Sequence, residues 1–162
     1  MPREYPIVRL EDVSPEAVSV EGGWRKIDIR FIITGEREGS KNCTMFRALF
    51  PPGARHMKHS HANSDELFYM IRGHGASGAG EKEHEMKAGS AHFIPKGVTH
   101  WLRNLSDTEP IEVVGVYLDA GNLKESGYVF EGEVTEKDMT VKKNSWGMRR
   151  EAKKFAQEGR SR

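Results

Sequence analysis

The sequence is poor in cysteine and has no long apolar run. Cys43 is the only cysteine among the 162 residues, which excludes an intrachain disulfide and fits a reducing compartment. No apolar run approaches the roughly 20 residues that a membrane-spanning helix needs. Residues 1–5 are not followed by the apolar region of a signal peptide. We therefore expect a cytoplasmic protein that is not associated with a membrane.

An excess of charge of either sign is also absent. The 25 Lys and Arg residues nearly cancel the 24 Asp and Glu residues, which leaves a formal net charge of +1. A nearly neutral chain has no global electrostatic attraction to nucleic acid or to an anionic membrane surface. The length fits a single domain with a sizeable core, and we expect no added DNA-binding domain. The partner that we expect is a small molecule.

Short segments with strand-like patterns follow one another along the chain. Between Trp24 and Thr34, apolar residues alternate with polar ones, which is the period of a strand with one buried face. Further strands are expected over residues 43–50, 67–71, 91–94 and 111–118. The last of these is the most apolar and should be central in its sheet. Many short strands separated by turns favour an all-β sandwich or barrel.

The remaining segments have weaker patterns. Residues 1–23 are predicted to be an irregular arm, residues 24–135 the barrel, and residues 136–162 a basic tail. The tail contains a short segment with helical spacing, which either binds an anionic partner or, as we favour, presents a solvated basic face. Residues 74–80, HGASGAG, are predicted to be a hairpin loop because they are small. His56 and His74 are expected to be exposed.

Histidines gather in two stretches that begin with glycine. The first, GARHMKHSHANSDELFYMIRG, covers residues 53–73 and contains His59, His61 and Glu66; the second, GSAHFIPKGVTHWLRN, covers residues 89–104 and contains His100. Side chains two apart on a strand share a face, so both imidazoles of the first stretch can reach one ion. A turn would return Glu66 to them. Imidazole and carboxylate groups bind divalent transition metals, although a single His-x-His is often a surface pair.

The two stretches together resemble the two motifs of the cupin family at every defining position. The first has Gly53, five residues, His59, one residue, His61, four residues, Glu66, six residues and Gly73; the second has Gly89, five residues, Pro95, one residue, Gly97, two residues, His100, three residues and Asn104. The resemblance implies a double-stranded β-helix, the cupin jelly-roll barrel, in a small single-domain protein. It implies that His59, His61, Glu66 and His100 are metal ligands. It also implies a homodimer, in which residues 1–34 are a candidate intersubunit arm.

The resemblance implies two kinds of enzyme chemistry and one binding role. We expect a non-haem Fe(II) dioxygenase, an oxidoreductase that binds a small chelating substrate beside O₂. The alternatives are a metal-dependent lyase, isomerase or decarboxylase, in which the metal acts as a Lewis acid, and a protein that only binds a small molecule. The ligand set also suits Mn(II), Ni(II) or Zn(II).

Catalytic residues beyond the ligands are less well marked. His92 and Tyr117 are the candidates that we select as acid, base or hydrogen-bond donor, and a purely structural role for His92 is the alternative. Glu112 and Arg47 are further candidates, and none of the four has an identifying spacing. Strand parity places Phe68 and Met70 on the face of Glu66, and Leu102 on the face of His100. Such an apolar wall suits a partly hydrophobic or aromatic substrate.

Overall fold

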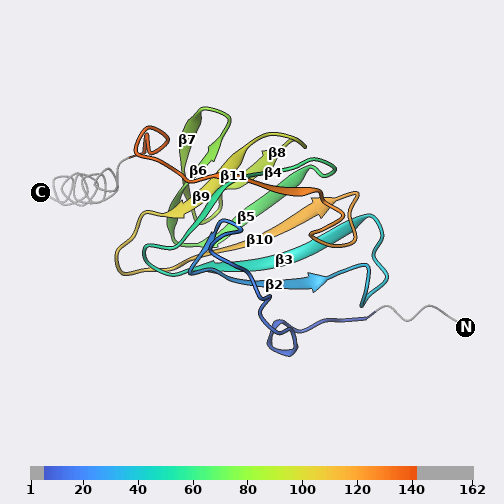
Figure 1. Ribbon diagram of the computed structural model, residues 1–162. Helices are drawn as coiled ribbons and strands as arrows, with labels where there is room; N and C mark the ends of the chain where they lie inside the picture. Colours follow the sequence, from blue (N-terminus) through green and yellow to red (C-terminus); the bar gives the residue numbers. More distant parts are fainter. Residues whose placement is uncertain (1–5, 142–162) are drawn as a thin grey trace, which may run out of the picture.

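The computed structural model describes residues 6–141, and strands dominate this part of the chain (Figure 1). One short 3-10 helix, η1 (Leu10–Asp12), lies in the N-terminal arm. The strands are β1 (Trp24–Arg25), β2 (Asp28–Ile33), β3 (Cys43–Phe50), β4 (Arg55–His61), β5 (Glu66–Arg72), β6 (His74–Ala79), β7 (Lys82–Lys87), β8 (Ala91–Ile94), β9 (His100–Asn104), β10 (Ile111–Leu118) and β11 (Tyr128–Gly132). Within residues 6–141, no helix is long and apolar enough to cross a membrane.

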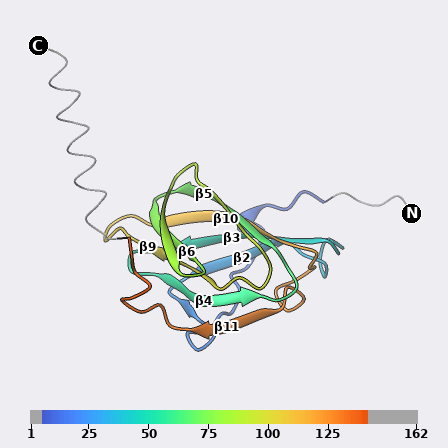
Figure 2. The same cartoon turned by 90° about the horizontal axis from the view of Figure 1, so that it is seen from above.

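The strands form two antiparallel sheets that face each other (Figures 1 and 2). Sheet A has the order β1-β4-β9-β6-β7, and β11 also pairs with β4; sheet B has the order β2-β3-β10-β5-β8. From β3 onward the chain passes repeatedly between the sheets, which is the winding of a double-stranded β-helix. The all-β jelly-roll prediction is therefore confirmed.

The core lies between the two sheets and is formed by the alternate, inward-facing residues of their strands. In β10, every second residue from Ile111 to Tyr117 is buried, and β10 is the central strand of sheet B, as expected. Gly115 interrupts this series of inward side chains because the ring of Phe46 fills its place. A Cβ atom at Gly115 would lie 2.3 Å from that ring. The inward face of β5 likewise carries Glu66, Phe68 and Met70, and the parity prediction is confirmed there.

Two predictions about individual segments were wrong. Residues 74–79 form strand β6, not a loop, between β7 and β9. Their small size is required by packing, because a Cβ atom at Gly78 would lie 2.0 Å from the ring of Trp101. Residues 24–34 form two strands in different sheets, since the chain turns at Lys26, whose φ of 58° lies in the left-handed region. Neither the packing of Trp101 against residues 74–79 nor the division of residues 24–34 between two sheets can be recognised from a local sequence pattern.

The segments flanking the barrel pack on its two sheets. In the arm, the amide of Glu16 donates to the carbonyl of Ile29 in β2 of the same chain. After β11, Val134 and Met139 pack against Trp101 on the outer face of sheet A. The helix predicted in the basic tail falls after residue 141, outside the described residues. The division into arm, barrel and tail stays a prediction.

Candidate metal centre

Three strands bring the four predicted ligands together. His59 and His61 come from the end of β4, Glu66 begins β5, and His100 begins β9. In the β4–β9 ladder His59 is directly opposite His100. One ligand atom from each residue lies within 4.8 Å of the others, and all four side chains are buried. The predicted set is thus one spatial cluster inside the barrel, while the metal-binding role of each residue stays a proposal.

Hydrogen bonds fix the orientation of two of the imidazoles. Nδ1 of His59 donates to the carbonyl of Met57 over 2.7 Å, and Nδ1 of His100 donates to the carbonyl of Val98 over 2.8 Å. A carbonyl can only accept, so Nδ1 carries the proton in both rings. The lone pair of a neutral ring is then on Nε2. This is the arrangement of a histidine that is ready to bind a metal.

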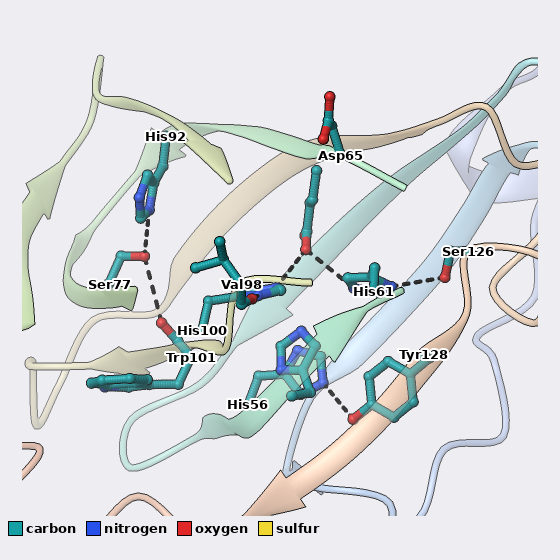
Figure 3. A network of polar contacts seen from close by, with 12 residues as sticks. His56, His61, Asp65, Ser77, His92, Val98, His100, Trp101, Ser126 and Tyr128 are labelled. Carbon is teal, nitrogen blue, oxygen red and sulfur yellow. Dashed lines mark hydrogen bonds and ion pairs between the residues drawn. The ribbon is translucent and has the colours of Figure 1, made fainter. Parts of the chain in front are cut away.

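In the third imidazole, that of His61, a serine fixes the proton on Nδ1 (Figure 3). Nδ1 of His61 lies 2.8 Å from Oγ of Ser126, and that hydroxyl donates to the carbonyl of Leu123 over 2.6 Å. Ser126 therefore accepts the Nδ1 proton and leaves the lone pair on Nε2. That Nε2 is buried without a hydrogen bond and lies 3.2 Å from Oε2 of Glu66. Because a buried polar atom without a partner is costly, the cluster fits a divalent cation.

The electrostatics of the cluster are dominated by burial and by the Glu66–His100 contact. Nε2 of His100 lies 2.7 Å from Oε2 of Glu66. Burial alone would raise the pKa of Glu66, but the adjacent His100 and His61 hold this pKa well below its usual range. Burial opposes charge on His100, yet the Glu66 carboxylate raises the pKa of His100. Burial, with His56 and His100 nearby, lowers the pKa of His59. Glu66 is therefore an ionised ligand candidate.

The two catalytic candidates lie in different places. The ring of Tyr117 lies 4.5 Å from that of His61, measured between centroids, and Tyr117 lines the cavity beside the cluster. Nδ1 of His92 lies 2.8 Å from Oγ of Ser77, and its ring packs edge-on against Phe68. Figure 3 shows His92 beside Ser77, away from His61. Tyr117 thus lines the cavity and His92 does not.

Arg47 and Glu112 do not approach the cluster. Nε of Arg47 donates to Oε1 of Glu112 over 2.7 Å, and Arg72 contacts the same carboxylate. Arg47 and Glu112 lie on the outer face of sheet B, because they alternate with the inward residues of β3 and β10. Strand parity therefore excludes both residues from the site.

His56, which we expected to be exposed, is a buried part of the site. Its ring is stacked between those of Trp24 and His59, with a centroid distance of 3.7 Å to each. His56 Nε2 lies 3.1 Å from the Tyr128 hydroxyl, which donates to the carbonyl of Gly22. Three residues apart on a regular strand, His56 and His59 would face opposite sides. The register of β4 against β9 shifts between them, and this irregularity turns both inward.

The expectation that His74 is exposed was also wrong. This side chain is buried, and its Nε2 lies 2.8 Å from Oε1 of Glu85.

A small cavity adjoins the cluster. Its volume is about 20 Å³, which is room for about one water molecule. The predicted wall residues Phe68 and Leu102 line it, whereas Met70 is buried elsewhere in the core. Among the described residues, no Lys or Arg lines this cavity. Its surface is mainly aromatic and aliphatic.

Comparisons with known proteins agree with the fold. A family model described as a cupin domain matches residues 46–117. An oxalate-binding protein of Thermotoga maritima is 27% identical over 104 residues, 64% of this chain and 86% of that protein. Protein SchB of Streptomyces halstedii is 32% identical over 103 residues, 64% of this chain and 70% of SchB. The crystal structure of a predicted oxalate decarboxylase from Thermotoga maritima, 25% identical, covers 70% of this chain and 98% of its own, with a TM-score of 0.62.

A similar barrel also occurs in a more distant protein. The polyketide cyclase RemF of Streptomyces resistomycificus has a TM-score of 0.66 at 18% identity, over 83% of this chain and 89% of its own. The match to the family model, the pair of motifs and the barrel lead to one conclusion: the chain belongs to the cupin family.

Proposed function

We propose that this protein is a non-haem Fe(II) dioxygenase that acts on a small organic substrate with chelating oxygens. The observation that carries the proposal is the set of three Nε2-directed imidazoles and one carboxylate beside a cavity with apolar walls. An Fe(II) ion held by these ligands would supply the redox chemistry between the substrate and O₂. Mn(II), Ni(II) and Zn(II) suit the same ligands.

The side chains around the ligands have supporting roles. With three neutral imidazoles and one carboxylate, a divalent ion keeps a net positive charge, which suits an anionic chelating group such as an enolate. The side chains of Phe46, Phe68 and Val113 give the cavity apolar walls. Burial raises the pKa of Tyr117 well above its usual value, so its hydroxyl stays protonated and can donate to a substrate oxygen. His92 is the other catalytic candidate, acting from outside the cavity lining.

The lining of the cavity favours redox chemistry over acid–base chemistry. Lyases and isomerases normally need a general acid or base in the pocket. Besides the ligands, His56 and Tyr117 are the titratable side chains of the described lining. Burial lowers the pKa of His56, whose ring is enclosed between Trp24 and His59. The Nε2 atom of His56 is also occupied by the Tyr128 hydroxyl, so Tyr117 is the remaining acid or base candidate in this lining.

The second candidate function is a non-redox one. The oxalate-binding relative and the predicted oxalate decarboxylase favour binding or decarboxylation of a small carboxylate. A dicarboxylate carries a second negative charge, and no basic side chain of the described cavity lining would neutralise it. This is why we place the dioxygenase first.

Oxygen uptake distinguishes the two functions. We expect anaerobically purified protein to contain iron, and the Fe(II)-loaded form to consume O₂ with a diketone, a catechol or another chelating enol, but not with oxalate. An oxygen electrode measures uptake, and metal analysis gives the content. Bound manganese, nickel or zinc, with no uptake after iron loading, would contradict the dioxygenase and favour Lewis-acid chemistry or simple binding.

We also propose that two copies associate through the outer face of sheet B. Leu67, Tyr69, Ile71 and Phe93 are exposed there on β5 and β8, and Leu67 is paired with Phe93. Contiguous apolar patches of this kind mark interaction sites. We expect a dimer in light scattering, and a monomer with unchanged metal content after Tyr69→Glu combined with Phe93→Glu. Val20→Glu, at an exposed position elsewhere, is the control, and a monomeric wild type would refute this interface.

The remaining partner and location proposals rest on composition. The near-neutral charge gives no reason to add nucleic acid or membrane as a partner. The single cysteine favours a reducing location, which we propose to be the cytoplasm.

A further inference from the structure

The cavity beside the metal ligands is too small for an organic substrate. Its volume of about 20 Å³ compares with about 300–1,000 Å³ for ordinary small-molecule pockets. A substrate that reaches the ligands with its oxygens must therefore place its remaining atoms elsewhere.

A second cavity, which we name the outer cleft, opens near the first. Its volume is about 620 Å³, within the range of small-molecule pockets. Its walls come from the N-terminal arm, from the end of β2 with the turn that follows, and from the β10–β11 connection. The apolar part of the wall consists of Val13, Phe31, Leu123 and Tyr128.

The turn after β2 and the connection after β10, which both contribute to the outer cleft, lie at the same end of the barrel (Figure 1). The amide of Gly35, after β2, donates to the carbonyl of Gly121, after β10, over 2.6 Å. Nδ2 of Asn122 donates to Glu36 across the same boundary. These bonds hold two segments far apart in the sequence as one concave surface.

Two aromatic side chains connect the outer cleft with the metal ligands. Tyr128 lines the cleft, and its ring centroid lies 5.1 Å from that of His59 and 5.6 Å from that of His61. Phe31 lines the cleft as well, and its ring lies 6.4 Å from that of Tyr117 in the inner cavity. The wall between the cavities is thus about one side chain thick.

The cleft is also connected to a metal ligand by hydrogen bonds. Leu123 lines the cleft with its side chain, and its carbonyl accepts from Ser126, which in turn accepts from His61. An occupant of the cleft therefore contacts the segment that orients His61. The side chain of Leu123 is only partly buried and makes apolar contacts with the core. It can therefore change its rotamer to fit an occupant of the cleft.

We propose that the outer cleft binds the apolar or aromatic body of the substrate, while the chelating oxygens reach the metal past Phe31 and Tyr128. This inference rests on the proposed metal site and narrows the substrate class to a chelating head with a ring-sized body. Two acidic and two basic side chains also line the cleft, namely Glu16, Glu36, Arg37 and Lys124. Their charges cancel, so the cleft has no preference for a strongly charged body. Oxalate, which has no body, falls outside this class.

Two hydroxamates test the cleft on Zn(II)-loaded protein, where no oxygen chemistry is needed. Acetohydroxamate offers the chelating head alone, and 4-phenylbenzohydroxamate adds an aromatic body. Calorimetry should give at least about ten-fold tighter binding of the second, because it buries apolar area in the cleft. Arg37→Trp and Ser14→Trp fill the cleft from two different walls, and each should abolish this gain without changing acetohydroxamate binding. Val129→Trp, on the exposed neighbour of Tyr128, should retain the gain.

The possible outcomes separate a failure of the cleft proposal from a failure of the metal-site proposal. If acetohydroxamate binds but the aromatic body gives no gain, or if the gain survives both tryptophan variants, the cleft is not the substrate site and the metal site stands. If acetohydroxamate does not bind to protein that contains zinc, the proposed open metal site fails, and the cleft proposal fails with it.

Discussion

Replacing His59 or His100 by alanine is expected to remove most of the bound metal and to leave the barrel folded. Each change deletes one of three imidazoles whose Nδ1 atoms are already fixed by the carbonyls of Met57 and Val98. Loss of an outer-shell partner typically costs about 10–100-fold in metal affinity, and loss of a ligand should exceed this. Metal per chain after dialysis measures the effect, and circular dichroism reports folding.

The control for this experiment is His84→Ala. His84 is exposed on β7 and is not part of the cluster, so its removal should leave the metal content unchanged. Equal metal in wild type and in both ligand variants would refute the assignment of the site.

Replacing Arg103 by methionine is expected to cause the largest loss of stability in the part of the chain outside the metal site. The carboxylate of Glu83, whose side chain is 0% exposed, accepts from Nε and Nη2 of Arg103, each over 2.7 Å, and from Nε1 of Trp101. Without Arg103 this charge stays buried without its cationic partner. The free energy of unfolding should fall by about 3–5 kcal/mol, as measured by urea denaturation of the metal-free protein.

An arginine on the surface provides the matched comparison. Arg72 contacts Glu112 from a side chain that is 56% exposed, so Arg72→Met should change the free energy of unfolding by less than about 1 kcal/mol. The double variant Glu83→Leu with Arg103→Met should recover much of the lost stability, because it removes both buried charges. A loss in Arg103→Met no larger than that in Arg72→Met would contradict this account.

Features that depend on local spacing could be read directly from the sequence. The alternation that starts at Glu66 correctly placed Phe68 and Met70 on the inward face of β5, because a strand turns successive side chains to opposite faces. The four metal-ligand candidates were identified because they stand at the spacing of the two cupin motifs, and the resemblance to that family implies their role. The same alternation, once the sheets are known, places Arg47 and Glu112 outside.

Features that depend on contacts between distant segments required the tertiary structure. The shift of register in β4 turned His56 inward against its sequence parity, and it follows from pairing with β9. The packing of Trp101 made a strand of the small residues around Gly78. Ser126, which orients His61, is 65 residues away from it in the sequence. The sequence by itself therefore determined the all-β fold class through local periodicity, and the candidate ligands through the spacing of motifs that resemble those of a known family. The tertiary structure alone decided what surrounds those ligands and where the outer cleft opens, because side chains from separate strands meet only in the closed barrel.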